Sequence, residues 1–187
     1  MFAQAIKRNL RLITSLTLIV AALSLLSSCA VTDVTQYKNE KPAFDLERYF
    51  TGKTEAWGIF QKRSGEVVKR FHVDIEGKKE GDELVLDERF TYSDGSKQTR
   101  IWRLKKNGED QWSGRADDVK GTAVGEVSGN AFKWQYVLLL PVDGTVYEMH
   151  MDDWMYMVDE QTLVNKTKMS KFGIDLGEVS IFFRRRP

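Results

Sequence analysis

Residues 131–140, AFKWQYVLLL, alternate between large apolar side chains and polar or smaller ones. Lys133 and Gln135 point to one face of an extended chain, and the opposite face is apolar throughout. That apolar face carries Phe132, Trp134, Tyr136, Leu138 and Leu140. A period of two with a single polar face is typical of a β-strand that is buried on one side. The stretch therefore predicts a half-buried strand.

The same alternation recurs along most of the chain. Residues 66–77 (EVVKRFHVDIEG) and 82–92 (DELVLDERFTY) each place apolar side chains on one face and charged ones on the other. Turn signals such as SDGS at 93–96, KNGED at 106–110 and PVDG at 141–144 separate these segments. Asp-Gly and Asn-Gly pairs of this kind are strong hairpin signals. The pattern predicts consecutive antiparallel strands.

About ten such strands fit between residue 54 and the end of the chain, and no helical pattern between them is long enough for a parallel crossover. An open meander of this size would expose long strand edges, which closure into a barrel removes. We therefore expect an all-β fold, an antiparallel up-and-down barrel of about eight to ten strands. A β-sandwich is the alternative.

The first residues have the order of a secretion signal. Residues 1–11 (MFAQAIKRNLR) are basic, and residues 12–26 are uncharged and too short for a transmembrane helix. Leu26-Ser27-Ser28-Cys29 follows and resembles the lipobox of bacterial lipoproteins. This resemblance implies a signal peptide at 1–28, cleavage before Cys29 and attachment of lipid to its sulfur.

Cysteine usage agrees with that interpretation. Cys29 is the only cysteine in the chain, so lipidation would remove the one reactive thiol of an exported protein. Residues 29–43 are predicted to form a lipidated tether and residues 44–187 the barrel domain. Ala30, which follows the cysteine in place of aspartate, favours the outer membrane, with the protein on its periplasmic face. The predicted membrane partner is thus bound through acylated Cys29.

Composition excludes some functions. Loss of residues 1–28 removes three basic residues and no acidic ones, which leaves a near-neutral domain with two more acidic than basic residues. Such a domain has no electrostatic basis for binding nucleic acid. The sequence also lacks the nucleophile, zinc and phosphate-loop motifs. We predict no catalytic residue, metal or cofactor, and lean against an enzyme.

Residues 149–157, MHMDDWMYM, place two aspartates within an apolar run. Neighbouring side chains on a strand point to opposite faces, so Asp152 and Asp153 cannot form a facing pair. The methionines share the face of Asp153, which predicts that this carboxyl lies inside the barrel. A buried carboxylate needs a partner. The candidates for ion pairs are Asp153, Arg100, Arg103, Arg115 and Asp117. A hydrogen-bonded carboxylate is the other structural explanation for Asp153, and a polar contact to a ligand is the alternative.

Two other polar groups have simpler explanations. Glu148, His150 and Asp152 alternate on the outer face, where their spacing is too large for one metal ion. Asp118 stands before a glycine turn and is expected to bond its own backbone.

Tryptophan, tyrosine and methionine supply the bulk of the predicted interior. They either fill the barrel or line an apolar pocket, and the sequence leaves both alternatives open. The candidate ligand-lining residues are Trp102, Trp134, Tyr136, Met149, Met151, Asp153 and Met155.

Several unusual strings resemble a known family. They are AWGIF (56–60), GRADDVKGTAVGEVSGN (114–130), LPVDG (140–144), MDDWMY (151–156) and KMSKFGIDLGEV (168–179). Together they are similar to domain-of-unknown-function family 3833, bacterial lipoproteins, over most of the mature chain. The resemblance implies a lipocalin-like barrel and no particular activity.

Location and fold together suggest a function. An aromatic- and methionine-rich barrel held at a membrane is expected to bind or carry a small apolar or amphipathic ligand, such as a lipid. The alternative is a structural or partner-binding lipoprotein with a filled barrel.

Overall fold

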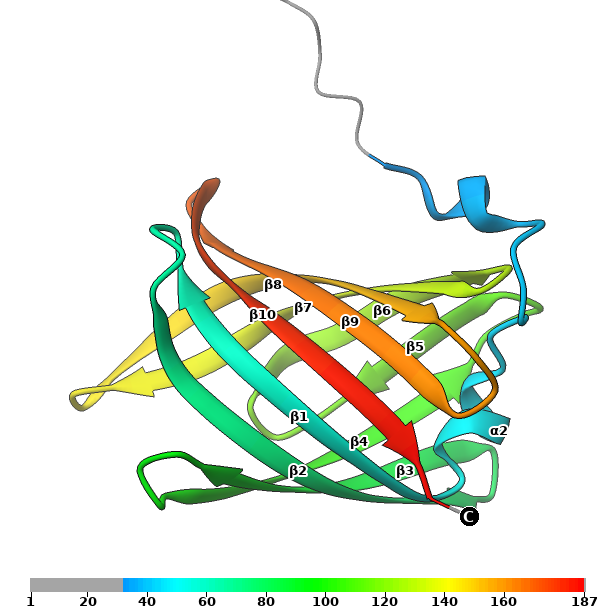
Figure 1. Cartoon of the computed structure of the whole chain (residues 1–187), viewed down its shortest axis with the longest axis horizontal. Coiled ribbons are helices and arrows are strands. Elements are labelled where there is room, and N and C mark those ends of the chain that lie inside the picture. Colours follow the sequence, from blue (N-terminus) through cyan, green and yellow to red (C-terminus); the bar gives the residue numbers. More distant parts are fainter. Residues whose placement is uncertain (1–31, 187) are drawn as a thin grey trace, which may run out of the picture. The chain divides into compact units, whose positions relative to one another are not determined.

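The computed structural model describes residues 32–186. Ten antiparallel strands follow one another around a closed barrel, in which the last strand pairs with the first (Figure 1). They are β1 (Gly52–Lys62), β2 (Val67–Glu80), β3 (Glu83–Tyr92), β4 (Lys97–Lys106), β5 (Gln111–Arg115), β6 (Val119–Ser128), β7 (Ala131–Val142), β8 (Thr145–Met157), β9 (Thr162–Lys171) and β10 (Ile174–Arg185). The up-and-down barrel is confirmed, and the sandwich is excluded.

The register explains which side chains enter the core. Residues opposite one another on antiparallel strands share a face. Trp134 of β7 pairs with Asp153 of β8, which pairs in turn with Thr167 of β9. All three side chains are buried. Asp153 and the apolar face of 131–140 thus point into the barrel, as their alternation predicts.

A short helix closes one end of the barrel. Helix α2 (Leu46–Phe50) lies at the end where β10 finishes (Figure 1). Its N-cap is Asp45, whose side chain accepts a hydrogen bond of 3.0 Å from the backbone N–H of Arg48. Leu46 and Phe50 are buried, and a Cβ on Gly77 would lie 1.8 Å from the Phe50 carbonyl oxygen. Only glycine allows so close an approach of the helix to β2.

The segment before α2 is packed rather than free. The 3₁₀ helix η1 (Val34–Tyr37) buries Val34, and the Tyr37 ring packs edge-on against Tyr156 at 5.2 Å between centroids. The Phe44 N–H donates a 2.7 Å hydrogen bond to the Gly129 carbonyl. From Val34 onward the predicted tether therefore belongs to the folded unit, because its few apolar side chains find contacts on the barrel.

The predicted signal peptide and Cys29 lie outside the described residues. No helix in the described part of the chain has the length and apolar character needed to cross a membrane.

Packing differs between the two ends of the barrel. The larger apolar cluster surrounds α2 and includes Leu163, Phe132 and Phe183, each 6% exposed or less. A smaller cluster of Met149, Met151 and Met169 lies toward the other end. Inward-facing side chains near that end are only partly buried. They include Phe60, Phe71, Phe90, Leu138 and Leu140. The half of the barrel away from α2 is therefore the accessible half.

Candidate ligand-binding site

A band of polar side chains crosses the apolar interior. Glu88 of β3 and Arg100 of β4 stand directly opposite each other, and their side chains are 13% and 14% exposed. The Arg100 Nε and Nη2 atoms donate hydrogen bonds of 3.0 and 2.7 Å to the Asp118 carboxylate. Arg100 Nη1 is 3.9 Å from a Glu88 oxygen. Arg100 is thus bound by one carboxylate in two-point geometry and lies within weaker range of a second.

Asp153 contributes the other carboxyl of this band. It is 6% exposed, and its Oδ1 atom has no hydrogen-bond partner among residues 32–186. The neighbouring Thr167 hydroxyl donates its own hydrogen bond of 3.0 Å to Asn165 Oδ1. A buried carboxyl oxygen without a donor is costly in free energy. Asp153 is therefore available for a further partner.

Burial changes the acidity of these groups. It raises the pKa of Asp153 to about 7, although Thr167 and Arg100 partly oppose the shift. Burial also raises the pKa of Glu88 to about 7, against the lowering effect of Arg100. The charge of Asp153 adds to the increase in the Glu88 pKa, so the two carboxyls lie within electrostatic range. The Tyr136 pKa is raised well above its ordinary value, chiefly by burial and then by Asp153.

Among residues 32–186, Asp153 does not form the predicted ion pair with an arginine. Arg100 pairs with Asp118 instead, so the prediction that Asp118 bonds its own backbone is also wrong. Arg103 and Arg115 both pair with Glu83, at 3.3 and 2.8 Å.

Asp117 is exposed and forms no ion pair with any residue between 32 and 186, contrary to its prediction as an ion-pair candidate. The side chain before it in the turn, Ala116, is partly buried, and Asp118 after it turns back to Arg100. In a turn this short, only one of the two aspartates is directed at the arginine.

The short length of strand β5 explains why Arg100 pairs with Asp118. Only Arg103–Lys106 of β4 pair with β5, so the part of β4 that holds Arg100 has no ladder on that side. The turn between β5 and β6 brings Asp118 to this position, where its side chain accepts hydrogen bonds from Arg100.

Sequence reasoning also missed Glu88. Its alternation with Leu84, Leu86 and Phe90 places it on their inner face, and this was the signal that could have identified it.

The predicted lining residues come together around the band. Trp102 packs edge-on against Trp134 and Tyr136, with ring centroids 5.7 and 5.3 Å apart. Met149 and Met151 are buried with Met169, which was not predicted. Tyr136 and Met155 are partly buried on the same inner face as Asp153. The candidate set thus lies on the inner surface, with Glu88, Arg100 and Met169 as additions.

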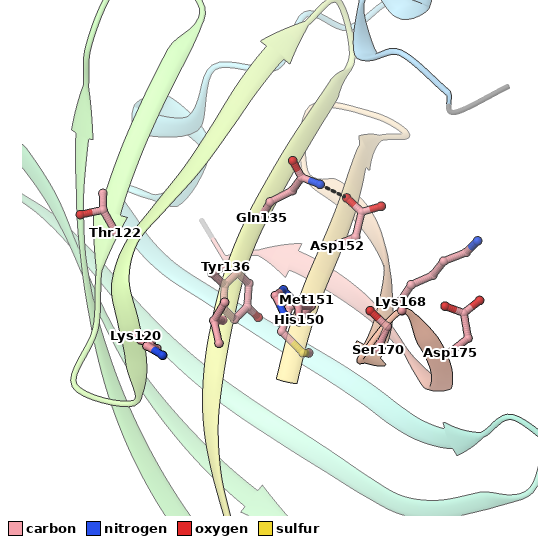
Figure 2. A pocket seen from close by; sticks show the side chains of 12 residues that line it. Lys120, Thr122, Gln135, Tyr136, His150, Met151, Asp152, Lys168, Ser170 and Asp175 are labelled. Carbon is pink, nitrogen blue, oxygen red and sulfur yellow. Dashed lines mark hydrogen bonds between the residues drawn. The ribbon is translucent and has the colours of Figure 1, made fainter. Parts of the chain in front are cut away.

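A groove of about 630 Å³ lies elsewhere, across β6 to β10 (Figure 2). Most of its lining side chains, such as Gln135, His150 and Asp152, belong to the outer face of the strands. Gln135 donates a 3.0 Å hydrogen bond to Asp152, and Lys120 pairs with Glu148 at 2.7 Å. The predicted outer-face position of Glu148, His150 and Asp152 agrees with this geometry. These contacts engage Asp152 and Lys120 of the groove.

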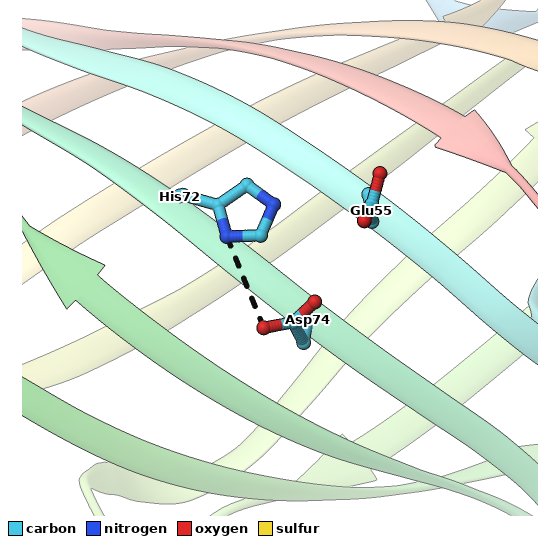
Figure 3. Close-up of side chains that lie close together, drawn as sticks. All are labelled: Glu55, His72 and Asp74. Carbon is cyan, nitrogen blue, oxygen red and sulfur yellow. Dashed lines mark ion pairs between the residues drawn. The ribbon is translucent and has the colours of Figure 1, made fainter.

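Glu55, His72 and Asp74 also gather on the outer surface, with ligand atoms within 4.8 Å of one another (Figure 3). His72 Nδ1 is 3.9 Å from Asp74, and Arg186 forms an ion pair with Glu55. The Glu55 charge is therefore already compensated by an arginine. We assign no metal site to these residues.

Comparison with known structures shows the same architecture elsewhere. The S-type phycobiliprotein lyase CPES from Guillardia theta superposes with a TM-score of 0.55 at 6% sequence identity. The match covers 84% of this chain and 99% of the lyase. At such low identity the likeness concerns the fold alone, and it agrees with the predicted lipocalin-like barrel.

Sequence comparison identifies the protein family to which the chain belongs. No curated protein matches the chain significantly. The model of one family, described as "Protein of unknown function (DUF3833)", matches residues 23–185. That range includes every strand of the barrel and confirms the resemblance noted in the sequence. The chain belongs to the DUF3833 family.

Proposed function

We propose that this protein is an envelope lipoprotein that binds a small apolar or amphipathic molecule in the accessible half of its barrel. The observation that carries the proposal is the buried Oδ1 atom of Asp153, which has no hydrogen-bond partner among residues 32–186 and lies in an inner wall that is largely apolar. Ligand sites commonly combine an apolar lining with a few polar groups that orient the ligand.

The distribution of burial supports this location. Around α2 the interior is filled by side chains such as Leu163 and Phe132, which leaves little space for a ligand there. In the other half, inward-facing Phe71, Phe90 and Leu138 remain partly exposed to solvent. The methionines of the smaller cluster are flexible and polarisable, which suits a ligand of variable shape. Figure 1 shows that α2 lies at one end of the barrel only.

Binding is tested by native mass spectrometry of protein purified without denaturation and stripped of detergent. We expect a bound molecule that disappears after extraction with organic solvent, and re-addition should change the fluorescence of Trp102 and Trp134. A spectrum of the protein alone, together with unchanged fluorescence across a panel of lipids, would favour the alternative of a filled, partner-binding barrel.

Anchoring through Cys29 is the second part of the proposal and rests on the sequence Leu26-Ser27-Ser28-Cys29. Cells fed an alkyne analogue of palmitate should label the protein, and Cys29→Ala should abolish the label completely. The label should fractionate with the outer membrane. Two or more acyl chains hold a protein stably on a membrane, whereas one does not. Label that persists in the Cys29→Ala protein would contradict lipidation at this residue.

A further inference from the structure

The polar band inside the barrel carries an excess of acid. Among residues 32–186, three carboxyl groups, on Glu88, Asp118 and Asp153, and one guanidinium, that of Arg100, act electrostatically on the buried Tyr136 hydroxyl. Asp118 engages that guanidinium at two points, 3.0 and 2.7 Å. Glu88 reaches it only at 3.9 Å, and Asp153 does not reach it within ion-pair distance. Two carboxyls are thus left without a full counter-charge.

This balance disfavours an anionic ligand. A fatty carboxylate entering the barrel would need a free cation, and Arg100 is already bound by Asp118. To bind Arg100 it would have to displace that two-point pair and then lie beside Glu88. Like charges in a region of low dielectric repel strongly. The Arg100 guanidinium is therefore already paired with Asp118 and is not free to bind an anionic ligand.

A cationic head group meets the opposite situation. Asp153 has a buried oxygen without a donor, and an ammonium group brings three donors and a positive charge. Aromatic rings lie close by, with Trp102 next to Tyr136 and Phe90 next to Tyr92. The faces of such rings attract cations. Methionines Met149, Met151 and Met169 provide apolar surface for a hydrocarbon chain.

We propose that the ligand is an amphipathic amine, an ammonium group on a hydrocarbon chain, whose head pairs with Asp153 and Glu88. The proposal rests on the proposed binding function and specifies the chemical class of the ligand. The hydrocarbon chain lies along the methionine cluster toward the accessible end. The recognition is a charge-assisted hydrogen bond to an acceptor that the fold leaves unsatisfied.

Three probes of equal chain length test the proposal: decylamine, decanol and decanoate, each below its micelle concentration. They are titrated at neutral pH into the mature chain from residue 29, carrying Cys29→Ser so that neither lipid nor detergent competes. Isothermal calorimetry measures the affinity. Decylamine is expected to bind about tenfold or more tightly than decanol, and decanoate more weakly than decanol. Amine binding should also release protons, because the ammonium favours the ionised carboxyls.

Two variants test whether Asp153 is the residue responsible for the preference for decylamine. Asp153→Asn should bring the affinity for decylamine close to that for decanol. Asp152→Asn, on the next residue but on the outer face, should change neither. Circular dichroism checks the fold of each variant, and Glu88→Gln replaces Asp153→Asn if the latter does not fold.

The outcomes separate the two proposals. Decanol or decanoate binding at least as tightly as decylamine would overturn the amine proposal and leave ligand binding intact. An amine preference that survives both Asp153→Asn and Glu88→Gln would also overturn it. If none of the three probes binds, the proposed binding function fails and the amine proposal fails with it.

Discussion

Raising the pH from about 5 to about 9 is expected to lower the free energy of unfolding by about 3 kcal/mol or more. The cause is the pair of buried carboxyls. The pKa of Asp153 is raised from 3.8 to about 7 in the folded protein, and that of Glu88 from 4.5 to about 7. Between the unfolded and folded values the native state binds more protons than the unfolded chain. This stabilisation is complete below about pH 4 and is lost as the pH rises through 7.

Unfolding by guanidinium chloride at a series of pH values, monitored by tryptophan fluorescence, measures how the free energy of unfolding depends on pH. The charged and titratable groups that act on the two carboxyls are Arg100, Asp118, Asp87, Asp152 and Tyr136. Asp153→Asn should remove a large part of the slope, whereas Asp152→Asn should leave it intact. A stability that stays level or rises between pH 5 and 9 would show that the carboxyls are not buried in this way.

Leu163→Ala is expected to destabilise the protein by about 2–5 kcal/mol, the usual cost of removing a buried leucine and leaving a cavity. Leu163 is 0% exposed and lies between Met157 of β8 and Phe183 of β10 in the cluster beside α2. Several rigid strands and the helix meet here, so the surroundings have little freedom to collapse. Denaturant unfolding at a single pH measures the loss from the shift of the midpoint.

Val164→Ala provides the matched control. Val164 follows directly on β9 but points to the outer face and is 38% exposed. Its truncation should cost about 0.5 kcal/mol or less. Because the two residues are neighbours, a shift of register by one position would exchange their roles. Equal losses for the two variants would refute the strand register.

Much of the candidate site could be predicted from alternation alone. The period of two along 149–157 separates Asp152 from Asp153, and the methionines mark the inner face. Alternation also predicts that Trp134, Met149 and Met151 face the interior, and the structure buries all three. Alternation is a property of each strand by itself, since successive side chains of extended backbone must point in opposite directions. It requires no knowledge of neighbouring strands.

The partners of the polar groups could not be predicted in this way. Arg100 was a candidate partner for Asp153, but it pairs with Asp118, because the short β5 brings that turn to the unpaired part of β4. The packing of helix α2 against the end of the barrel and its close approach to Gly77 likewise depend on segments distant in the sequence.

The sequence by itself determined the antiparallel strands and their turns, the inward face of the strands with clear alternation and the position of Asp153 within the wall. The tertiary structure alone decided that the Oδ1 atom of Asp153 has no hydrogen-bond partner among the described residues, which end of the barrel is filled and where Arg100 is bound. The physical reason is that side-chain direction follows from local backbone geometry. Ion pairing and burial instead depend on register and strand length around the whole closed barrel.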